Sequence, residues 1–251
     1  MLGVAGAYEV YRLAERTGVQ PLDAIGYVGA ALLPVGVLGA LSRTLGFAPI
    51  GLLVGGTLWV LLVMTVALRL RPPNSRPLSA VAVTVFGVVY AAGLPAFLLA
   101  LRYAEAVPSA WAGTWLVFLP LVITWVGDSL AMAGGRLFGG PKMAPVLSPN
   151  KTWAGAFAGG AAGLVVGPVY GTLILAPAGM VIPAWQLAVF GLAVAIVGQT
   201  GDLAESLFKR EAGVKDSGTF FPGHGGVLDR LDSLYWVLPA SVAILLLLDV
   251  I

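Results

Sequence analysis

Long apolar runs separated by short polar segments dominate the sequence. Because an α-helix rises 1.5 Å per residue, a run of about 22 residues covers about 33 Å, enough for the hydrocarbon core of a bilayer. Seven runs approach or reach this length: 24–40, 47–68, 78–101, 110–133, 153–176, 183–201 and 234–250. The pattern predicts an all-α fold, a polytopic integral membrane helix bundle of about seven full spans.

The N-terminal residues 1–11 are also apolar, but they are too short to span a bilayer. They lack the basic region and the cleavage pattern of a secretory signal. We therefore expect an N-terminal apolar stump, either the tail of an earlier helix or a segment at the membrane interface. Because no soluble domain, linker or repeat is evident, the sequence predicts a single transmembrane domain over residues 1–251.

Cationic side chains are distributed unevenly over the connecting segments. When these segments are assigned alternately to the two sides of a membrane, twelve of the fourteen Lys and Arg residues fall on one side. The twelve are Arg12, Arg16, Arg69, Arg71, Arg76, Arg136, Lys142, Lys151, Lys209, Arg210, Lys215 and Arg230. Only Arg43 and Arg102 fall on the other side. The positive-inside rule predicts that the basic side faces the cytoplasm.

The composition agrees with a lipid environment and excludes several kinds of chemistry. Only 10% of the residues are charged, whereas about 25% is usual for soluble domains. The mean hydropathy is +0.94. The absence of cysteine excludes disulfides, thiolate metal sites and thiol nucleophiles. A net charge of +2 is too small to predict a nucleic-acid partner.

Polar residues concentrate in two segments on the basic side, 127–155 and 198–232. Asp128 and Asp202 lie near the ends of apolar spans, where a carboxylate is costly unless it faces a polar cavity. Carboxylates in a chain with a single histidine, His224, suit a hard cation such as Mg²⁺, which also binds phosphate oxygens. Alternatively, Asp128 is a structural acid at a helix end and His224 an ordinary loop residue.

The same two segments carry cations and glycine pairs that suit phosphate. Five cations fit phosphate oxygens: Lys151, Lys209, Arg210, Lys215 and Arg230. Glycine pairs such as Gly225 and Gly226 let backbone N–H groups approach an anion. The combination favours phosphoryl or nucleotidyl transfer, in which positioning and charge stabilisation dominate. For cations that flank spans, such as Lys209 and Arg210, anchoring to lipid headgroups is the alternative.

The segment 206–233, "SLFKREAGVKDSGTFFPGHGGVLDRLDS", resembles the signature of the phosphatidate cytidylyltransferase family, also called CDP-diacylglycerol synthases. That pattern is S-x-x-K-R-x(4)-K-D-x-G-x(3)-P-G-H-G-G-x-x-D-R-x-D, and all of its fixed positions match. The segment "LSPNKTWAG" resembles a second family block. It departs from the family at Asn150 and Ala154, where Lys and Glu are common, so no role of that Glu is carried over. Seven spans plus a stump is also a low count for a family with about eight or nine.

The resemblance implies a reaction in which CTP and phosphatidic acid give CDP-diacylglycerol and pyrophosphate. It implies Mg²⁺ as cofactor, as one or two divalent ions, with a monovalent ion as a further possibility. On this hypothesis Asp202 and Asp229 hold the metal, with Asp128 as a further candidate. It also implies a homodimer in contact with membrane lipid. The expected location is the prokaryotic cytoplasmic membrane, with the active site facing the cytoplasm.

The other roles follow from charge. Four cations would neutralise the triphosphate: Lys209, Arg210, Lys215 and Arg230. Asp216 and Asp232 would orient these cations or join the metal shell. Three further groups would contact the nucleotide, namely Ser148 and Lys151 from the earlier segment and the Gly225–Gly226 backbone. His224 would donate to pyrophosphate rather than act as a general base, because a phosphate nucleophile is already ionised at neutral pH.

Alternative functions make different demands on the sequence. A related enzyme would use another lipid phosphate, such as an isoprenoid glycerol ether, and the sequence does not separate the two. A transporter would place charges at mid-bilayer and show repeat symmetry. A retinal protein would need a lysine within the last span, and residues 234–251 contain none. A CDP-alcohol phosphotransferase would carry a D-G-x-x-A-R motif, which is absent.

Overall fold

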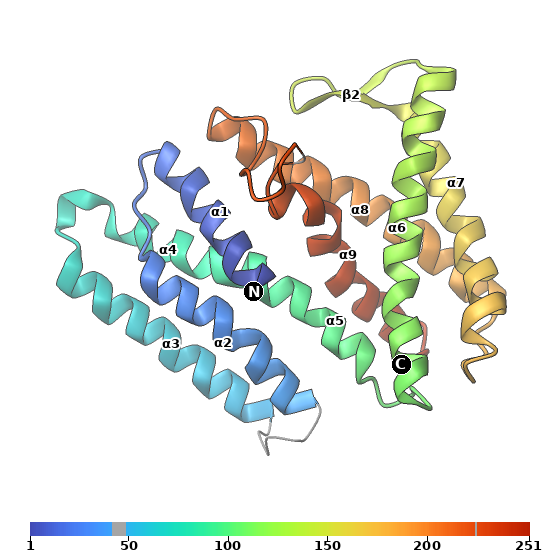
Figure 1. Ribbon diagram of the computed structural model, residues 1–251, viewed down its shortest axis with the longest axis horizontal. Helices are drawn as coiled ribbons and strands as arrows, with labels where there is room; N and C mark the ends of the chain where they lie inside the picture. The colour runs from blue at the N-terminus through green and yellow to red at the C-terminus, as the bar shows by residue number, and fades with distance from the viewer. Residues whose placement is uncertain (42–48, 224) are drawn as a thin grey trace. The chain divides into compact units, whose positions relative to one another are not determined.

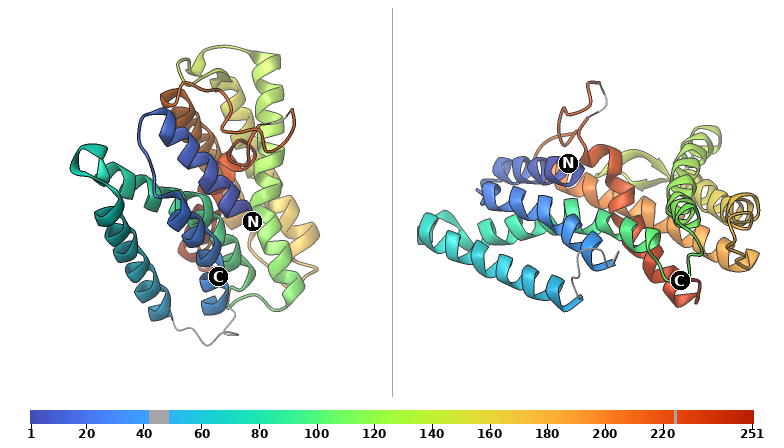
Figure 2. Two further views of the ribbon diagram at one scale, coloured as in Figure 1. Left: turned by 60° about the vertical axis from the view of Figure 1, so that its left-hand side comes forward. Right: turned by 60° about the horizontal axis from the view of Figure 1, so that its bottom comes forward.

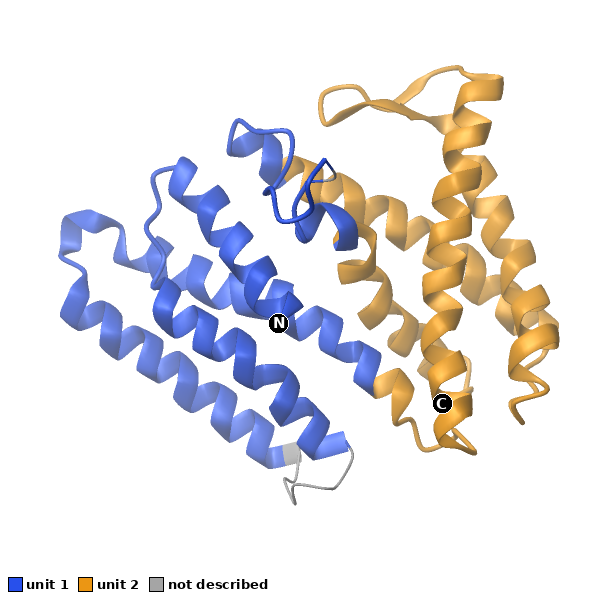
Figure 3. Ribbon diagram, viewed as in Figure 1, with its two compact units in different colours: residues 1–99, 208–231 blue, residues 100–207, 232–251 orange. Residues whose placement is uncertain are grey.

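The computed structural model describes residues 1–41, 49–223 and 225–251. The chain divides into two compact units (Figure 3). Unit 1 comprises Met1–Leu99 and Phe208–Leu231, and unit 2 comprises Ala100–Leu207 and Asp232–Ile251. Because the chain enters each unit twice, residues that are distant in sequence become neighbours within one unit.

Seven helices among the described residues are long and apolar enough to cross a membrane, as the sequence predicted. These spans are Asp23–Leu41, Ile50–Leu70, Pro77–Arg102, Ala110–Phe138, Trp153–Leu175, Ala184–Glu211 and Leu228–Leu247. Their surfaces expose large apolar side chains, including Leu68, Phe157 and Leu247. Such surfaces are unfavourable in water and suit contact with acyl chains. The all-α membrane bundle is therefore confirmed.

Unit 1 contains the N-terminal helices, labelled in Figure 1, and Phe208–Leu231, which is most of the signature segment. Its elements are α1 (Leu2–Arg16), α2 (Asp23–Leu41), α3 (Pro49–Leu70), η1 (Pro73–Ser75), α4 (Pro77–Val88), the π-helical turn η2 (Val89–Gly93) and the start of α5 (Leu94–Arg102). Helix α2 lies beside α1 and α3. The end of α8 (Ala184–Glu211) also belongs here, where the Phe208 ring packs edge-on against the rings of Phe86 and Tyr90.

The N-terminal apolar stump is a helix of 15 residues that docks against the spans of unit 1. Tyr11 is buried, and its hydroxyl donates a 2.8 Å hydrogen bond to the carbonyl of Thr84 on α4. The ring lies against Gly26 and Gly87, where any side chain would collide with it. Helix α1 is thus a packed part of unit 1.

Unit 2 is built around α6 (Ala110–Phe138) and α7 (Trp153–Tyr170), which lie side by side in Figure 1 and in both views of Figure 2. Small residues permit this approach: a Cβ at Gly155 would lie 2.5 Å from the Ala131 carbonyl oxygen. Further along α7, Gly163 meets Gly191 of α8 backbone to backbone. The π-helical turn η3 (Gly171–Leu175) continues α7, and α9 (Leu228–Leu247) supplies its residues from Asp232 onward.

A short antiparallel hairpin, which the all-α prediction omitted, joins α6 to α7. It pairs β1 (Lys142–Ala144) with β2 (Ser148–Thr152), with Lys142 opposite Thr152 and Ala144 opposite Ser148. The Thr152 hydroxyl then accepts a 3.2 Å hydrogen bond from Gly155 N–H and caps α7. The cap fixes the position of Lys151, the preceding residue, at the start of the helix.

Candidate functional site

The signature segment folds around the carboxylate of Asp229, in the first turn of α9. Asp229 Oδ1 accepts a hydrogen bond from Lys209 Nζ at 2.7 Å. Asp229 Oδ2 accepts three more, from Ser217 N–H at 2.8 Å, the Ser217 hydroxyl at 2.9 Å and Gly226 N–H at 2.8 Å. An ionised carboxylate offers about four acceptor positions. The acid is therefore the centre of a cluster formed by Lys209, Ser217, Gly226 and Asp229.

The Lys209–Asp229 ion pair is buried. Their side chains are only 11% and 8% exposed. A buried ion pair is tolerable only when hydrogen bonds satisfy its remaining polar atoms. The three donors on Asp229 Oδ2 meet this requirement for the acid, and the N-terminal end of α9 adds a favourable dipole.

The turn that precedes α9 requires glycine. Phe221 N–H donates to the Gly225 carbonyl at 2.9 Å, which closes the turn. Gly223 and Gly225 have φ angles of +73° and +84°, in the left-handed region. In addition, a Cβ at Gly225 would lie 2.6 Å from Asp229 Oδ2. The predicted site residue His224 lies outside the described residues.

The other predicted cations of the signature segment lie on the surface. Arg210 is exposed, and its guanidinium donates to the Val214 carbonyl at 2.9 Å. Lys215, Asp216 and Arg230 are also exposed. These cations can reach an anion without first leaving a buried partner. Lys209, in contrast, is held by Asp229.

Unit 2 holds a second cluster, formed by Asp128, Lys151 and Asp202. Lys151 Nζ lies 2.7 Å from Asp202 Oδ2, and Asp202 and Lys151 both act electrostatically on Asp128. The Lys151 and Asp202 side chains are 24% and 33% exposed, and Asp128 is exposed. The structure thus brings together three residues that the sequence assigned to metal or nucleotide binding. Ser148, the fourth such residue in unit 2, is half-buried at the start of β2.

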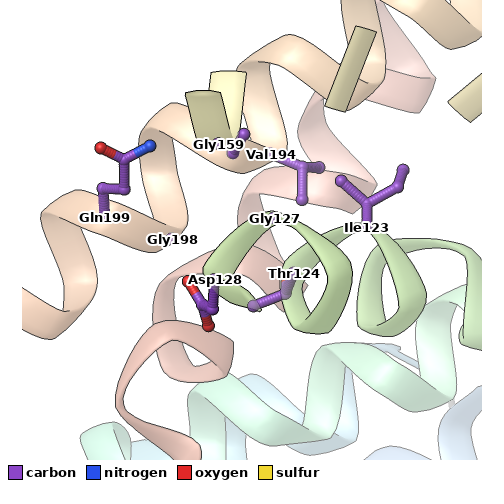
Figure 4. A pocket seen from close by; sticks show the side chains of 9 residues that line it. Ile123, Thr124, Gly127, Asp128, Gly159, Val194, Gly198 and Gln199 are labelled. Carbon is purple, nitrogen blue, oxygen red and sulfur yellow. The ribbon is translucent and has the colours of Figure 1, made fainter. Parts of the chain in front are cut away.

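A small cavity of about 10 Å³, the size of roughly one water molecule, adjoins this cluster. Thr124 and Asp128 of α6 and Val194 and Gln199 of α8 line it (Figure 4). The Gln199 side-chain amide donates to the Ala156 carbonyl at 3.3 Å and so ties α8 to α7. The cavity is too small for a nucleotide, and its polar lining side chains are Thr124, Asp128 and Gln199.

The predicted acids are divided between the two units. Asp232 belongs to unit 2, where its Oδ1 accepts from Ser233 N–H at 2.7 Å. Asp202 and Asp229 belong to different units, so their shared metal role stays a prediction. Among residues 1–41, 49–223 and 225–251, no group of three or more His, Asp or Glu side chains gathers as a metal site would require.

Sequence reasoning missed one acid of the site, Glu9 of α1. Its side chain is buried and accepts hydrogen bonds from Ser217, Val227 and Leu228 in the signature segment. The available signal was a single acid within the apolar N-terminal stretch "GVAGAYEVY". An acid in such a stretch needs a polar partner, but nothing local identifies that partner.

The helical spans and the two acid–base clusters define a polytopic α-helical membrane protein with charged sites in its polar segments. The model of the cytidylyltransferase family matches residues 1–248, and the chain belongs to this family. This finding confirms the resemblance inferred from the signature segment.

Curated relatives agree. The chain is 50% identical over 121 residues to a phosphatidate cytidylyltransferase of Brucella abortus (strain 2308), a match that covers 48% of this chain and 43% of the relative. It is 42% identical over 127 residues to a phosphatidate cytidylyltransferase of Staphylococcus saprophyticus, a match that covers 51% of this chain and 47% of the relative. In both comparisons the chain matches less than half of the relative's length.

Proposed function

We propose that this protein transfers the CMP moiety of CTP to phosphatidic acid, forming CDP-diacylglycerol and pyrophosphate. The observation that carries the proposal is the signature segment folded as one cluster around Asp229, in a chain that belongs to the cytidylyltransferase family. The printed names of relatives at 42% and 50% identity support the same reaction. The seven apolar helices suit an enzyme whose substrate and product both carry acyl chains.

The reaction needs no protein nucleophile. A phosphate oxygen of phosphatidic acid forms a bond to the α-phosphorus of CTP, and the bond from this phosphorus to the α,β-bridging oxygen breaks. Pyrophosphate leaves with the electron pair. The protein has to hold two anions together and compensate the charge that accumulates on the phosphate oxygens, as in other phosphoryl-group transfers.

The exposed cations of unit 1 are the groups that would bind phosphate. Arg210, Lys215 and Arg230 are exposed, and a guanidinium can bind two phosphate oxygens at once. Lys209 is oriented by Asp229 and would direct its charge to one position. In the proposal, Arg210, Lys215 and Arg230 bind and orient the triphosphate, while Asp216, an acid of the same unit, remains a candidate for orienting them.

Mg²⁺ fits the donor chemistry of unit 2 better than that of unit 1. The carboxylates of Asp128 and Asp202 are at least partly exposed and offer the oxygen ligands that Mg²⁺ prefers. Asp229 already accepts four hydrogen bonds, so fewer of its lone pairs are available. Asp128 and Asp202 would hold the ion in our proposal, with Lys151 beside them. When bound, the ion would neutralise phosphate charge.

The orientation and the assembly belong to the same proposal. The cation distribution along the chain supports a signature segment that faces the cytoplasm, and relatives from bacteria support a prokaryotic cytoplasmic membrane. The family resemblance supports a homodimer.

A turnover assay tests the function directly. Purified protein in lipid nanodiscs receives CTP, Mg²⁺ and phosphatidic acid, and both products are quantified. We expect CDP-diacylglycerol and pyrophosphate in equal amounts. Parallel reactions replace CTP by dCTP or ATP, and phosphatidic acid by an isoprenoid glycerol ether phosphate. No liponucleotide from phosphatidic acid, with product from the ether phosphate, would reassign the acceptor, and no product from any pair would reject the proposal.

A further inference from the structure

Glu9 is a buried acid whose hydrogen-bond partners all lie in the signature segment. Its side chain is 3% exposed. Oε1 accepts from Val227 N–H at 2.8 Å, and Oε2 accepts from Leu228 N–H at 2.9 Å and from the Ser217 hydroxyl at 2.8 Å. A buried carboxylate is tolerated only when its oxygens are satisfied in this way. The signature segment therefore stabilises Glu9, and Glu9 in turn restrains the segment.

Two of these donors belong to the N-terminus of α9. The first N–H groups of a helix have no partner within the helix, and a negative charge near them is favourable. Val227 and Leu228 supply such N–H groups just before and at the first residue of α9. Glu9 thus caps α9 from another helix, 218 and 219 positions away in the sequence.

The fixed glycines of the signature leave room for this carboxylate. A Cβ at Gly218 would lie 2.7 Å from Glu9 Oε1. A Cβ at Gly226 would collide with Glu9 Oε2 and with the Ser217 hydroxyl. Neither glycine has a positive φ angle. Space for Glu9 is therefore the reason that these two positions exclude a side chain.

The Ser217 hydroxyl joins Glu9 to the Asp229 cluster. It lies 2.8 Å from Glu9 Oε2 and 2.9 Å from Asp229 Oδ2. Since a hydroxyl has one hydrogen to donate, the two carboxylates share it. Ser217 thus connects Glu9 to Asp229, which also accepts a hydrogen bond from Lys209.

We propose that Glu9 is a positioning residue that holds the signature segment from α1, so that Asp229 and Lys209 are fixed for the transfer reaction. This inference rests on the proposed function. Glu9 acts through Ser217 and the α9 N-terminus and makes no contact with substrate in the proposal.

The primary test compares Glu9→Gln with Glu15→Gln, which removes an acid from the same helix. Glu15 pairs with Arg12 at 2.6 Å and has no part in the signature segment. Because small displacements of reacting groups can lower rates by up to about a hundredfold, we expect kcat/KM for CTP to fall at least about tenfold in Glu9→Gln. The Glu15→Gln variant should keep the wild-type value.

Hydrogen–deuterium exchange separates positioning from a general loss of stability. In Glu9→Gln, exchange should rise in the peptide 214–228, which contains Ser217, Val227 and Leu228, and stay unchanged in the spans of unit 2. A merely structural role would raise exchange throughout unit 1 and leave the KM for CTP unchanged in the folded fraction. Wild-type kinetics together with wild-type exchange in this peptide would overturn the inference.

Gly218→Ala provides a second variant that removes no acid. The three atoms nearest to its new methyl group would all belong to Glu9, with Oε1 at 2.7 Å. We expect the same local rise in exchange and a loss of kcat/KM of similar size. If Glu9→Gln does not fold, Gly218→Ala serves as the test of the inference. Wild-type kcat/KM and wild-type exchange at 214–228 in Gly218→Ala would then overturn it.

The two proposals fail differently. If the wild-type protein forms no CDP-diacylglycerol, the proposed function fails, whereas increased exchange at 214–228 in Glu9→Gln still shows that Glu9 holds the segment. If the wild-type protein is active and both variants match it in rate and exchange, only the positioning role fails.

Discussion

Lys209 Nζ lies 2.7 Å from Asp229 Oδ1, and this contact joins the last turn of α8 to the first turn of α9. The two residues are 20 positions apart, and the connection between α8 and α9 lies between them in the sequence. Because both side chains are almost fully buried, the pair orients the loop and cannot also be a freely mobile phosphate ligand.

Replacing Asp229 tests this central pair. Asp229→Asn leaves the Lys209 ammonium buried without its counter-ion, and breaking a buried pair in this way costs about 3–5 kcal/mol. We expect a lower melting temperature and a loss of turnover of at least about a hundredfold. Glu211→Gln, at an exposed acid of α8, is the matched control and should change neither quantity. Near-normal turnover in Asp229→Asn would contradict the organising role of the acid.

Replacing Asp202 tests the proposed Mg²⁺ site. Its ion pair with Lys151 is partly exposed, so Asp202→Asn should change the unfolding free energy by at most about 1 kcal/mol. The Mg²⁺ concentration needed for half-maximal activity should rise about tenfold or more, because one oxygen ligand is lost. Titration of activity with Mg²⁺, with Asp23→Asn on α2 as control, measures this effect. An unchanged Mg²⁺ requirement would remove Asp202 from the metal site.

The exposed cations of the signature segment should act on the nucleotide without affecting the fold. In the double variant Lys215→Gln and Arg230→Gln, we expect the KM for CTP to rise about tenfold, which corresponds to about 1.4 kcal/mol of binding. The unfolding free energy should change by no more than about 0.5 kcal/mol, as is usual at exposed positions. Arg69→Gln, at the end of α3, is the control. Equal KM values in the double variant and Arg69→Gln would argue against nucleotide binding by these cations.

Tyr11 makes the stability of unit 1 sensitive to high pH. Burial raises the pKa of the Tyr11 phenol above its ordinary value of 10.0. The unfolded chain therefore releases this proton at lower pH than the folded chain does. The contribution of the protonated Tyr11 phenol to the free energy of unfolding is fully present below about pH 10. It is lost as the pH rises toward the pKa of Tyr11 in the folded protein.

We expect Tyr11→Phe to unfold at a lower temperature at pH 8, since it loses the hydrogen bond to the Thr84 carbonyl, a loss of about 1 kcal/mol. Its melting temperature should then fall less steeply above pH 10 than that of the wild type. Tyr103→Phe, at an exposed tyrosine, is the control. Parallel pH profiles of Tyr11→Phe and the wild type would exclude Tyr11 as the titrating group.

The membrane helices could be predicted because the apolar runs are long and their positions need no knowledge of partners. The run 24–40 became the span Asp23–Leu41, for example. The helix predicted at 183–201 extends to Glu211, ten residues further than predicted. Hydropathy shows where the apolar residues end, whereas the helical hydrogen bonds continue past that point. The hairpin Lys142–Thr152 was missed because its two strands are too short for an alternating pattern.

The candidate site could be predicted only in part. The signature positions of Lys209 and Asp229 follow from local spacing, and the structure joins them. The role of Glu9 does not follow from local spacing, because its partners lie 208 to 219 positions away. Long-range pairs of this kind depend on how the helices pack, and neither composition nor periodicity carries that information.

The cap that Glu9 places on α9 also orders events during biosynthesis. Chains emerge from the ribosome with the N-terminus first. Glu9 therefore has none of its native hydrogen-bond donors until Ser217 has been synthesised, 208 residues later. The signature segment is complete only when nearly all of the described residues have been translated. A chain whose synthesis stops midway therefore lacks the cluster around Asp229.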